Sequence, residues 1–220
     1  MTRVLVLHSG GLDSSVCLAS AVAEYGAPNC RSISINYGQR HKKEMNYADK
    51  LCSLLNVTRQ VIKLPPIEGV MLTDPTIEVP NLRYDQITGV SPTYVPFRNG
   101  LMLANAACIA QHEGFDLIYY GAHAEDAQND AYPDCMFEFN GPMAAAIYVG
   151  TYHKVRLVTP LQWLMKSEIV EKGAKLEVPF ELTWSCYKGE EKHCGACPTC
   201  YSRKEAFIHA GVKDPTEYAQ

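Results

Sequence analysis

The chain has 220 residues, enough for one domain of ordinary size with a small appendage and a substantial hydrophobic core. Hydrophobic residues make up 47% and charged residues 20% of it, a composition that excludes an intrinsically disordered chain. The 20 basic and 24 acidic side chains give a net charge of −4, which argues against a protein built mainly to hold a nucleic acid.

The first 64 residues alternate short apolar runs with amphipathic segments. The apolar or alternating runs predict three strands, at residues 3–8, 30–37 and 58–64. Between them, apolar residues recur every three or four positions, which predicts helices at residues 12–25 and 41–55. The order strand–helix–strand–helix–strand is typical of a parallel sheet with crossover helices.

Residues 65–96 interrupt this alternation. They hold six prolines and no sustained period, so we predict a long irregular insertion. The rest of the chain returns to regular structure, with helices predicted at 98–113, 135–148, 166–174 and 201–210, strands at 115–121 and 155–158, and a polar loop at 122–134. We therefore predict an α/β fold with a doubly wound parallel sheet of about five strands. Residues 1–182 form its main domain, and residues 183–220 form a C-terminal metal-binding segment of the same compact unit.

The nine cysteines are unevenly distributed. Five are scattered and are expected to be small buried side chains. The other four follow the spacing C-x7-C-x2-C-x2-C near the C-terminus: Cys186, Cys194, Cys197 and Cys200. Four thiolates at this spacing match the ligand set of a structural Zn²⁺ ion, with no open coordination position for catalysis. An iron–sulfur cluster, which also takes four cysteines, is the main alternative.

A glycine-rich loop joins the first predicted strand to the first predicted helix. Its sequence is Ser9-Gly10-Gly11-Leu12-Asp13-Ser14, followed by Ser15. Backbone N–H groups and a helix N-terminus at such a loop favour the binding of phosphate. The loop matches neither of the common nucleotide fingerprints, so these six residues alone also allow an ordinary strand-to-helix turn.

The loop resembles the PP-loop of the N-type ATP pyrophosphatases, which cleave ATP between the α- and β-phosphates. Six further segments narrow the match, at residues 35–41, 95–99, 121–126, 132–135, 183–187 and 194–203. Together they resemble the 7-cyano-7-deazaguanine synthase family, QueC, over nearly the whole chain. The resemblance implies an ATP-dependent carbon–nitrogen ligase of queuosine biosynthesis. It would convert 7-carboxy-7-deazaguanine and ammonia to the nitrile through an acyl-adenylate and an adenylated amide.

The resemblance also implies a set of site residues. The ATP-binding set comprises His8, Ser9, Gly10, Gly11, Leu12, Asp13, Ser14 and Ser15. The catalytic set comprises Lys166, Asp13 and Arg98, and the set for the deazaguanine or Mg²⁺ comprises Arg98, Asn99, Asp126, Asp130 and Asp134. Zn²⁺ is the expected structural cofactor, and ATP enters as a substrate with Mg²⁺. Each carboxylate or cation also has a plainer interpretation, as a helix cap or a solvated charge.

Two other functions stay open at this stage. A PP-loop enzyme acting on another carboxylate or on tRNA would share the first motif. A zinc-knuckle module that binds nucleic acid would explain the cysteines but not the first 180 residues. We expect small-molecule substrates and a homodimer, with no nucleic-acid partner. The longest apolar run, residues 101–110, is too short to span a bilayer, and residues 1–7 lack a secretory signal, so we expect a cytoplasmic protein without a membrane partner.

Overall fold

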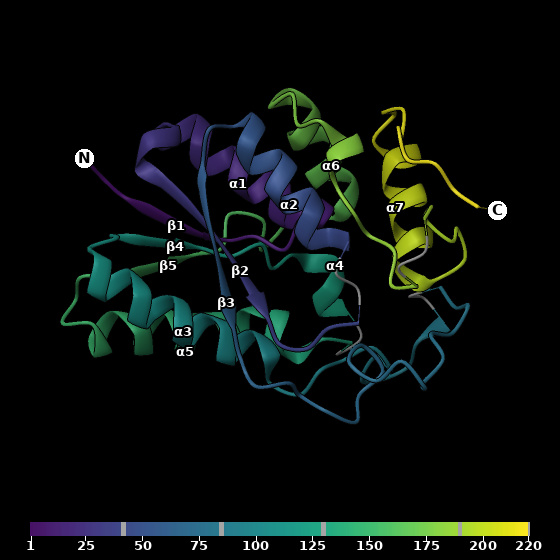
Figure 1. Ribbon diagram of the computed structural model, residues 1–220, viewed down its shortest axis with the longest axis horizontal. Helices are drawn as coiled ribbons and strands as arrows, with labels where there is room; N and C mark the ends of the chain where they lie inside the picture. The colour runs from purple at the N-terminus through teal and green to yellow at the C-terminus, as the bar shows by residue number, and fades with distance from the viewer. Residues whose placement is uncertain (41–42, 84–85, 129–130, 189–190, 220) are drawn as a thin grey trace.

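The computed structural model describes residues 1–40, 43–83, 86–128, 131–188 and 191–219. Five parallel strands form one sheet in the order β3-β2-β1-β4-β5 (Figure 1). Their bounds are β1 Val4–Leu7, β2 Cys30–Asn36, β3 Thr58–Lys63, β4 Leu117–Tyr119 and β5 Arg156–Val158. All four residues of β1 are buried, as expected for a central parallel strand covered on both faces. The predicted parallel sheet of five strands is confirmed.

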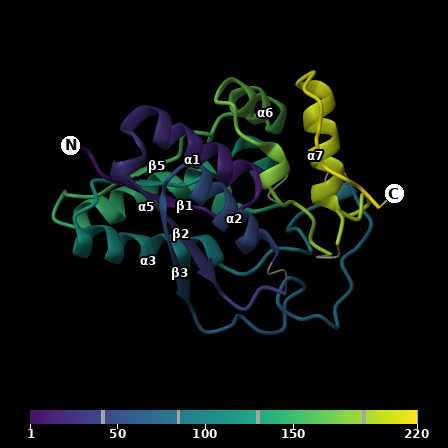
Figure 2. The ribbon, with the colours of Figure 1, turned by 45° about the horizontal axis from the view of Figure 1, so that its top comes forward.

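Helices cover both faces of the sheet (Figures 1 and 2). One face carries α1 Leu12–Tyr25, α2 Lys43–Leu54 and α6 Lys166–Lys175, and α7 Pro198–His209 packs beside α6. The other face carries α3 Arg98–Glu113 and α5 Phe137–Gly150. Each face has its own apolar core, one around Val16 and Ile169 and the other around Leu103 and Ile118. The sheet is therefore doubly wound, as predicted. None of the helices in the described ranges has the length and apolar character needed to cross a membrane.

Several predicted boundaries shift for local reasons. The last helix begins at Pro198 instead of residue 201, because proline is well suited to the first turn of a helix. A short helix, α4 Ala124–Ala127, lies inside the predicted polar loop, and the His123 side chain caps it. A 3₁₀ turn at Pro133–Cys135 delays the start of α5 to residue 137. The predicted start of the second helix, residue 41, lies outside the described residues.

The proline-rich insertion is irregular, as predicted, but it is held by specific contacts. One nitrogen of Arg40, Nη1, donates to the carbonyl oxygens of Met71 and Asp74 at 3.1 Å and of Ile77 at 2.6 Å. Leu72 and Val95 are buried against Tyr37, which follows β2. The insertion therefore packs beside the carboxyl end of the sheet.

The order of the strands predicts where a ligand binds. Chain connections leave the adjacent strands β1 and β4 toward opposite faces, which opens a crevice beyond their carboxyl ends. The glycine-rich loop follows β1, and Gly121 follows β4, where a Cβ atom on Gly121 would lie 3.5 Å from Ser14. The proline-rich insertion and the C-terminal segment gather at the same end of the molecule (Figure 2).

Gly10 fits the loop for a reason of packing. Its φ is +98°, and a Cβ atom there would lie 2.0 Å from the carbonyl oxygen of Glu44 and 2.8 Å from the backbone nitrogen of Ala48. The glycine therefore lets the loop touch the backbone of α2, where a side chain cannot be accommodated.

We expect Gly10→Ala to lower the free energy of unfolding by about 2–5 kcal/mol, which combines the positive φ with overpacking. Urea denaturation measures this loss. The matched control is Gly211→Ala, since Gly211 has a φ of +63° and a Cβ atom added there would meet nothing within 4 Å. Equal losses in the two variants would show that the close approach to α2 carries no cost.

Candidate active site

A cavity of about 240 Å³ lies at the carboxyl edge of the sheet. Its walls come from the β1–α1 loop, the end of β2 and the first turns of α2, α3 and α6. Leu72 of the insertion and Trp184, Ser185 and Tyr187 of the C-terminal segment close it. Of the predicted site residues, those that line it are His8, Ser9, Gly11, Leu12, Asp13, Ser14, Arg98, Asn99, Asp126 and Lys166.

The serines of the loop hold its shape. The backbone N–H and the hydroxyl of Ser9 both lie 3.2 Å from the Ser14 hydroxyl, which in turn donates to the Gly11 carbonyl at 3.1 Å. The backbone N–H of Gly11 donates to the Ser9 hydroxyl at 3.1 Å. Trp184 fastens the loop from outside, because its backbone N–H donates to the Gly10 carbonyl at 2.9 Å. The N-terminus of α1 thus faces the cavity with its partial positive charge.

Two polar residues of the predicted ATP-binding set have buried side chains. The His8 ring lies 3.2 Å from the hydroxyls of both Ser15 and Ser32, and burial followed by the charge of Arg59 lowers the pKa of His8 to about 3. Ser15 is fully buried and does not line the cavity. The neutral His8 ring therefore links the end of β1 to β2, through Ser32, and to α1, through Ser15.

Asp13 lies at the centre of a charged cluster. Its Oδ2 atom is 3.3 Å from Nζ of Lys166 and 3.6 Å from Nε2 of His123, which is 3.4 Å from Oδ2 of Asp126. Burial alone would raise the pKa of Asp13, but Lys166 and then His123 hold it well below its usual range. Burial likewise opposes a charged Lys166, whereas Asp13, Asp126 and Glu125 raise its pKa. Both partners are therefore charged at neutral pH.

The cluster leaves two buried polar atoms unsatisfied. Among the described residues, neither Oδ1 of Asp13 nor Nε2 of His123 has a hydrogen-bond partner. Nδ1 of His123 accepts the N–H of Asp126 at 3.4 Å, so a neutral His123 carries its proton on Nε2. An unsatisfied carboxylate oxygen beside the cavity, near a second carboxylate, fits the oxygen ligands that Mg²⁺ prefers.

Asp134 has a structural position. It is 3% exposed and does not line the cavity, and its Oδ2 atom accepts the N–H of Asn99 at 3.0 Å. Its carboxylate therefore caps the N-terminus of α3, where a negative charge is favourable. Arg98 faces the cavity with Nη1 donating to the Tyr37 hydroxyl at 3.1 Å. Asp130 lies outside the described residues.

Other lining residues were not predicted from the sequence. The aromatic side chains of Tyr37, Tyr120, Trp184 and Tyr187 line the cavity, and so does Glu44 of α2. Burial raises the pKa of Glu44 to about 7, against the lowering effects of Arg98 and a hydrogen bond with Ser9. Burial also raises the pKa of Cys135, which keeps this thiol neutral. The tyrosines and Cys135 lie in or beside segments that resemble the family, so those segments could have indicated them. No motif or spacing in the sequence indicates Glu44.

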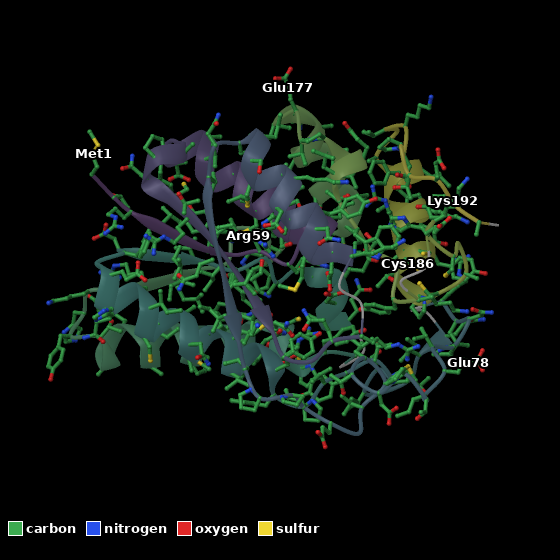
Figure 3. All side chains as sticks on the ribbon, viewed as in Figure 1. Met1, Arg59, Glu78, Glu177, Cys186 and Lys192 are labelled. Carbon is green, nitrogen blue, oxygen red and sulfur yellow. The ribbon has the colours of Figure 1, made fainter. Side chains whose placement is uncertain are left out.

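The four C-terminal cysteines form one buried group. Their sulfur atoms all lie within 4.8 Å of one another, and Sγ of Cys197 lies 3.4 Å from Sγ of Cys200. Backbone N–H groups of Cys194 and Lys188 point to Sγ of Cys186 at 3.3 and 3.4 Å. Sulfur atoms this close, buried and supplied with N–H donors fit a four-thiolate metal site. Figure 3 shows Cys186 beside α7, at the end of the molecule where Glu78 of the insertion also lies.

Comparison with known proteins identifies the family. The family model of the queuosine biosynthesis protein QueC matches residues 3–211. The chain belongs to the QueC family. Its relatives in this family include the 7-cyano-7-deazaguanine synthases of Thermoplasma volcanium, at 43% identity over 99% of this chain and 91% of that one, and of Aliarcobacter butzleri, at 40% identity over 99% and 96%.

Solved structures share the fold of this QueC-family chain. The U34-tRNA thiolase NcsA of Methanococcus maripaludis, which has a [4Fe-4S] cluster, covers 94% of this chain with 64% of its own, at a TM-score of 0.50 and 17% identity. The NMN synthetase of Francisella tularensis covers 96% of this chain with 78% of its own, at the same TM-score and identity. At this identity the likeness concerns the fold alone, which agrees with the predicted class.

Proposed function

We propose that this protein is an ATP-dependent ligase that converts 7-carboxy-7-deazaguanine and ammonia to 7-cyano-7-deazaguanine. The observation that carries the proposal is the geometry of one cavity. The PP-loop, the Asp13–Lys166 pair, Arg98 and a set of aromatic side chains all line it. Membership of the QueC family, whose members in Thermoplasma volcanium and Aliarcobacter butzleri are named 7-cyano-7-deazaguanine synthase, supports this substrate.

The phosphates of ATP belong at the PP-loop. Backbone N–H groups of Ser9–Ser14 and the N-terminus of α1 attract the anion, and the Ser9 and Ser14 hydroxyls add donors. Lys166 stabilises the charge that develops on pyrophosphate as the α–β bond breaks. Asp13 holds Lys166 in place. Asp13 and Asp126 are also the carboxylates that would hold Mg²⁺, which when bound neutralises part of the triphosphate charge.

The deazaguanine belongs on the aromatic side of the cavity. Tyr37, Tyr120 and Tyr187 offer flat surfaces on which a purine-like ring can stack. Arg98 lies beside them and pairs with the substrate carboxylate or with the α-phosphate, since guanidinium binds both well. This orientation brings the carboxylate toward the phosphate end of the cavity. The acid is then adenylated, because hydroxide is a poor leaving group and AMP is a good one.

The metal at the cysteine group is proposed to be a structural Zn²⁺. The four thiols supply a closed ligand set, which suits structure and not catalysis. We propose that residues 183–220 form one compact unit with residues 1–182. In support, the buried Arg203 donates to the Phe180 carbonyl at 3.1 Å, the Ser202 hydroxyl donates to Glu125 at 2.8 Å, and the backbone N–H of Trp184 donates to the Gly10 carbonyl at 2.9 Å. A cysteine-rich metal site of this kind also accords with a reducing, cytoplasmic location.

A homodimer is proposed through the face made by α3 and α5. These helices lie on one side of the sheet, and large apolar side chains on them or directly before them are exposed: Phe97, Leu101, Phe137 and Val149. Exposed apolar groups on one face are typical of an association surface. Light scattering on the purified protein tests this state, and a monomer at micromolar concentration contradicts it.

A product assay tests the activity. We expect the purified enzyme to release pyrophosphate from ATP when 7-carboxy-7-deazaguanine is present, and to release AMP and form the amide and the nitrile when ammonia is added. Mass spectrometry distinguishes the two products. Release of AMP with another carboxylate or with tRNA, and not with the deazaguanine acid, would contradict the proposed substrate.

A further inference from the structure

Three carboxylates line the cavity, and two of them already have basic partners. Asp13 pairs with Lys166 at 3.3 Å, and Asp126 lies 3.4 Å from the His123 ring. The third is Glu44, on the first turn of α2. Within the described residues, no lysine or arginine side chain forms an ion pair with it. A carboxylate in such a position is a candidate partner for a cation that arrives with the reaction.

Residues of three other elements line the cavity together with Glu44: Ser9 of the PP-loop, Tyr37 after β2 and Arg98 of α3. The loop packs directly on the first turn of α2, where a Cβ atom on Gly10 would lie 2.0 Å from the Glu44 carbonyl oxygen. Burial raises the pKa of Glu44, and the positive charge of Arg98 opposes that rise. Glu44 therefore lies where the phosphate end of the cavity meets the side that carries Arg98. Under the proposed function, the acyl carbon of the adenylated substrate lies between these two parts of the cavity.

Bound ATP makes an unpaired carboxylate unfavourable at this place. Glu44 lines the same cavity as the PP-loop and its helical turn packs against that loop, so negative phosphate groups come close to it. The repulsion is relieved when a cation sits between the two groups or when the carboxylate takes up a proton. Ammonium provides both, because it is a cation when it binds and a proton donor when it reacts.

We propose that Glu44 forms the ammonium subsite of the cavity and is the base that converts ammonium to the attacking ammonia, an inference that rests on the function proposed above. The Glu44 carboxylate takes one proton from ammonium. The freed lone pair forms the C–N bond to the acyl carbon of the adenylate, the C–O bond to AMP breaks, and AMP leaves with the bonding electrons. A second N–H proton passes from the adduct to solvent, which leaves the neutral amide. The pKa of about 7 at Glu44 suits a base that works near neutral pH.

The test compares two nucleophiles on the same acyl-adenylate. Ammonia is almost entirely protonated at neutral pH, whereas hydroxylamine is a weaker base and is largely neutral there. We expect Glu44→Gln to slow amide formation from ammonium by about 10²-fold, the lower end of the range for general base catalysis. Formation of the hydroxamate from hydroxylamine should stay near the wild-type rate. Glu44→Asp, which keeps a carboxylate, should recover part of the ammonium reaction.

The pH dependence provides a second measurement. In the wild type, amide formation should fall as the pH drops below about 7, because Glu44 becomes protonated and can no longer accept the proton. In Glu44→Gln the rate should keep rising with pH as free ammonia accumulates. Glu171→Gln is the matched control, since Glu171 is an exposed carboxylate on α6.

The outcomes separate this inference from the proposed function. If the rates with ammonium and with hydroxylamine fall equally, Glu44 acts in ATP binding, Mg²⁺ binding or folding. That result would overturn the ammonium subsite. An unchanged rate with ammonium, or an unchanged pH profile, would overturn it as well. If the wild-type enzyme forms no AMP with either nucleophile, the proposed function itself fails and the subsite fails with it.

Discussion

Cys197→Ser should abolish binding of the proposed structural metal and destabilise the protein by about 4 kcal/mol or more, the range reached when a structural metal site is lost. Cys197 is fully buried, and its sulfur lies 3.4 Å from that of Cys200. A serine hydroxyl is a poor ligand for Zn²⁺ compared with a thiolate. Elemental analysis measures the metal, and urea denaturation measures the free energy of unfolding.

The loss should extend from the metal to the active site. Cys197 is the residue before α7, and Thr199 of that helix lines the cavity. Ser202 on the same helix donates to Glu125 at 2.8 Å, and Glu125 accepts the backbone N–H of Lys166 at 3.2 Å. A displaced α7 therefore removes one wall of the cavity and one support of the Lys166 segment.

A matched variant separates metal loss from cysteine loss. Of the five scattered cysteines, all expected to be buried, Cys108 on α3 is exposed, so the expectation is wrong for this residue. Cys108→Ser should therefore keep its metal and near wild-type stability. A Cys197→Ser protein with a full complement of zinc would show that this residue is not a ligand. If the wild-type protein contains iron and shows a visible absorption band, the cysteine group holds an iron–sulfur cluster and the zinc assignment is wrong.

The parallel sheet could be predicted from the sequence because the patterns that indicate its strands and helices are local. Short apolar runs such as Val4–Leu7 alternate with amphipathic segments such as Leu12–Tyr25, and a parallel sheet follows from that order. The cysteine group was equally accessible, since its close spacing in the chain already brings the sulfur atoms together. Features of this kind need no knowledge of distant contacts.

Roles that depend on distant contacts could not be predicted. Asp134 caps α3 through a bond to Asn99, 35 residues earlier in the chain. Before the fold is known, its carboxylate cannot be distinguished from one that lines the cavity, such as that of Asp126. Likewise, the backbone of α2 lies so close to Gly10 that an added Cβ atom would come within 2.0 Å of it, and this packing was invisible in a loop that resembles a phosphate site.

The position of Glu44 in the cavity could not be predicted from the sequence either. It lines the cavity only because the first turn of α2 packs against the PP-loop, from which β2 and α1 separate it in the chain. Its sequence neighbours are ordinary helix residues, several of them with charged side chains. Its raised pKa arises from burial, and burial of a charged residue is decided by the tertiary structure.

Lys166→Ala should lower turnover by about two to three orders of magnitude, the loss expected for one electrostatic donor at a developing charge. Lys166 is the first residue of α6, its side chain lines the cavity, and its Nζ atom lies 3.3 Å from Asp13. Asp13, Asp126 and Glu125 raise its pKa against the effect of burial, so the ammonium stays charged throughout the neutral range. This fixed positive charge suits the role proposed for Lys166 beside the departing pyrophosphate.

Binding of the deazaguanine acid should change little in this variant, because Arg98 and the tyrosines remain. Lys166→Arg should recover part of the turnover, since it restores the charge without the compact shape of an ammonium group. Lys175→Ala is the matched control, as Lys175 is an exposed residue at the other end of α6. Removing Lys166 also leaves Asp13 without its closest cation, so a melting curve must show that the variant is folded at the assay temperature. Full turnover in a folded Lys166→Ala protein, or a loss explained entirely by unfolding, would reduce Lys166 to a structural partner of Asp13.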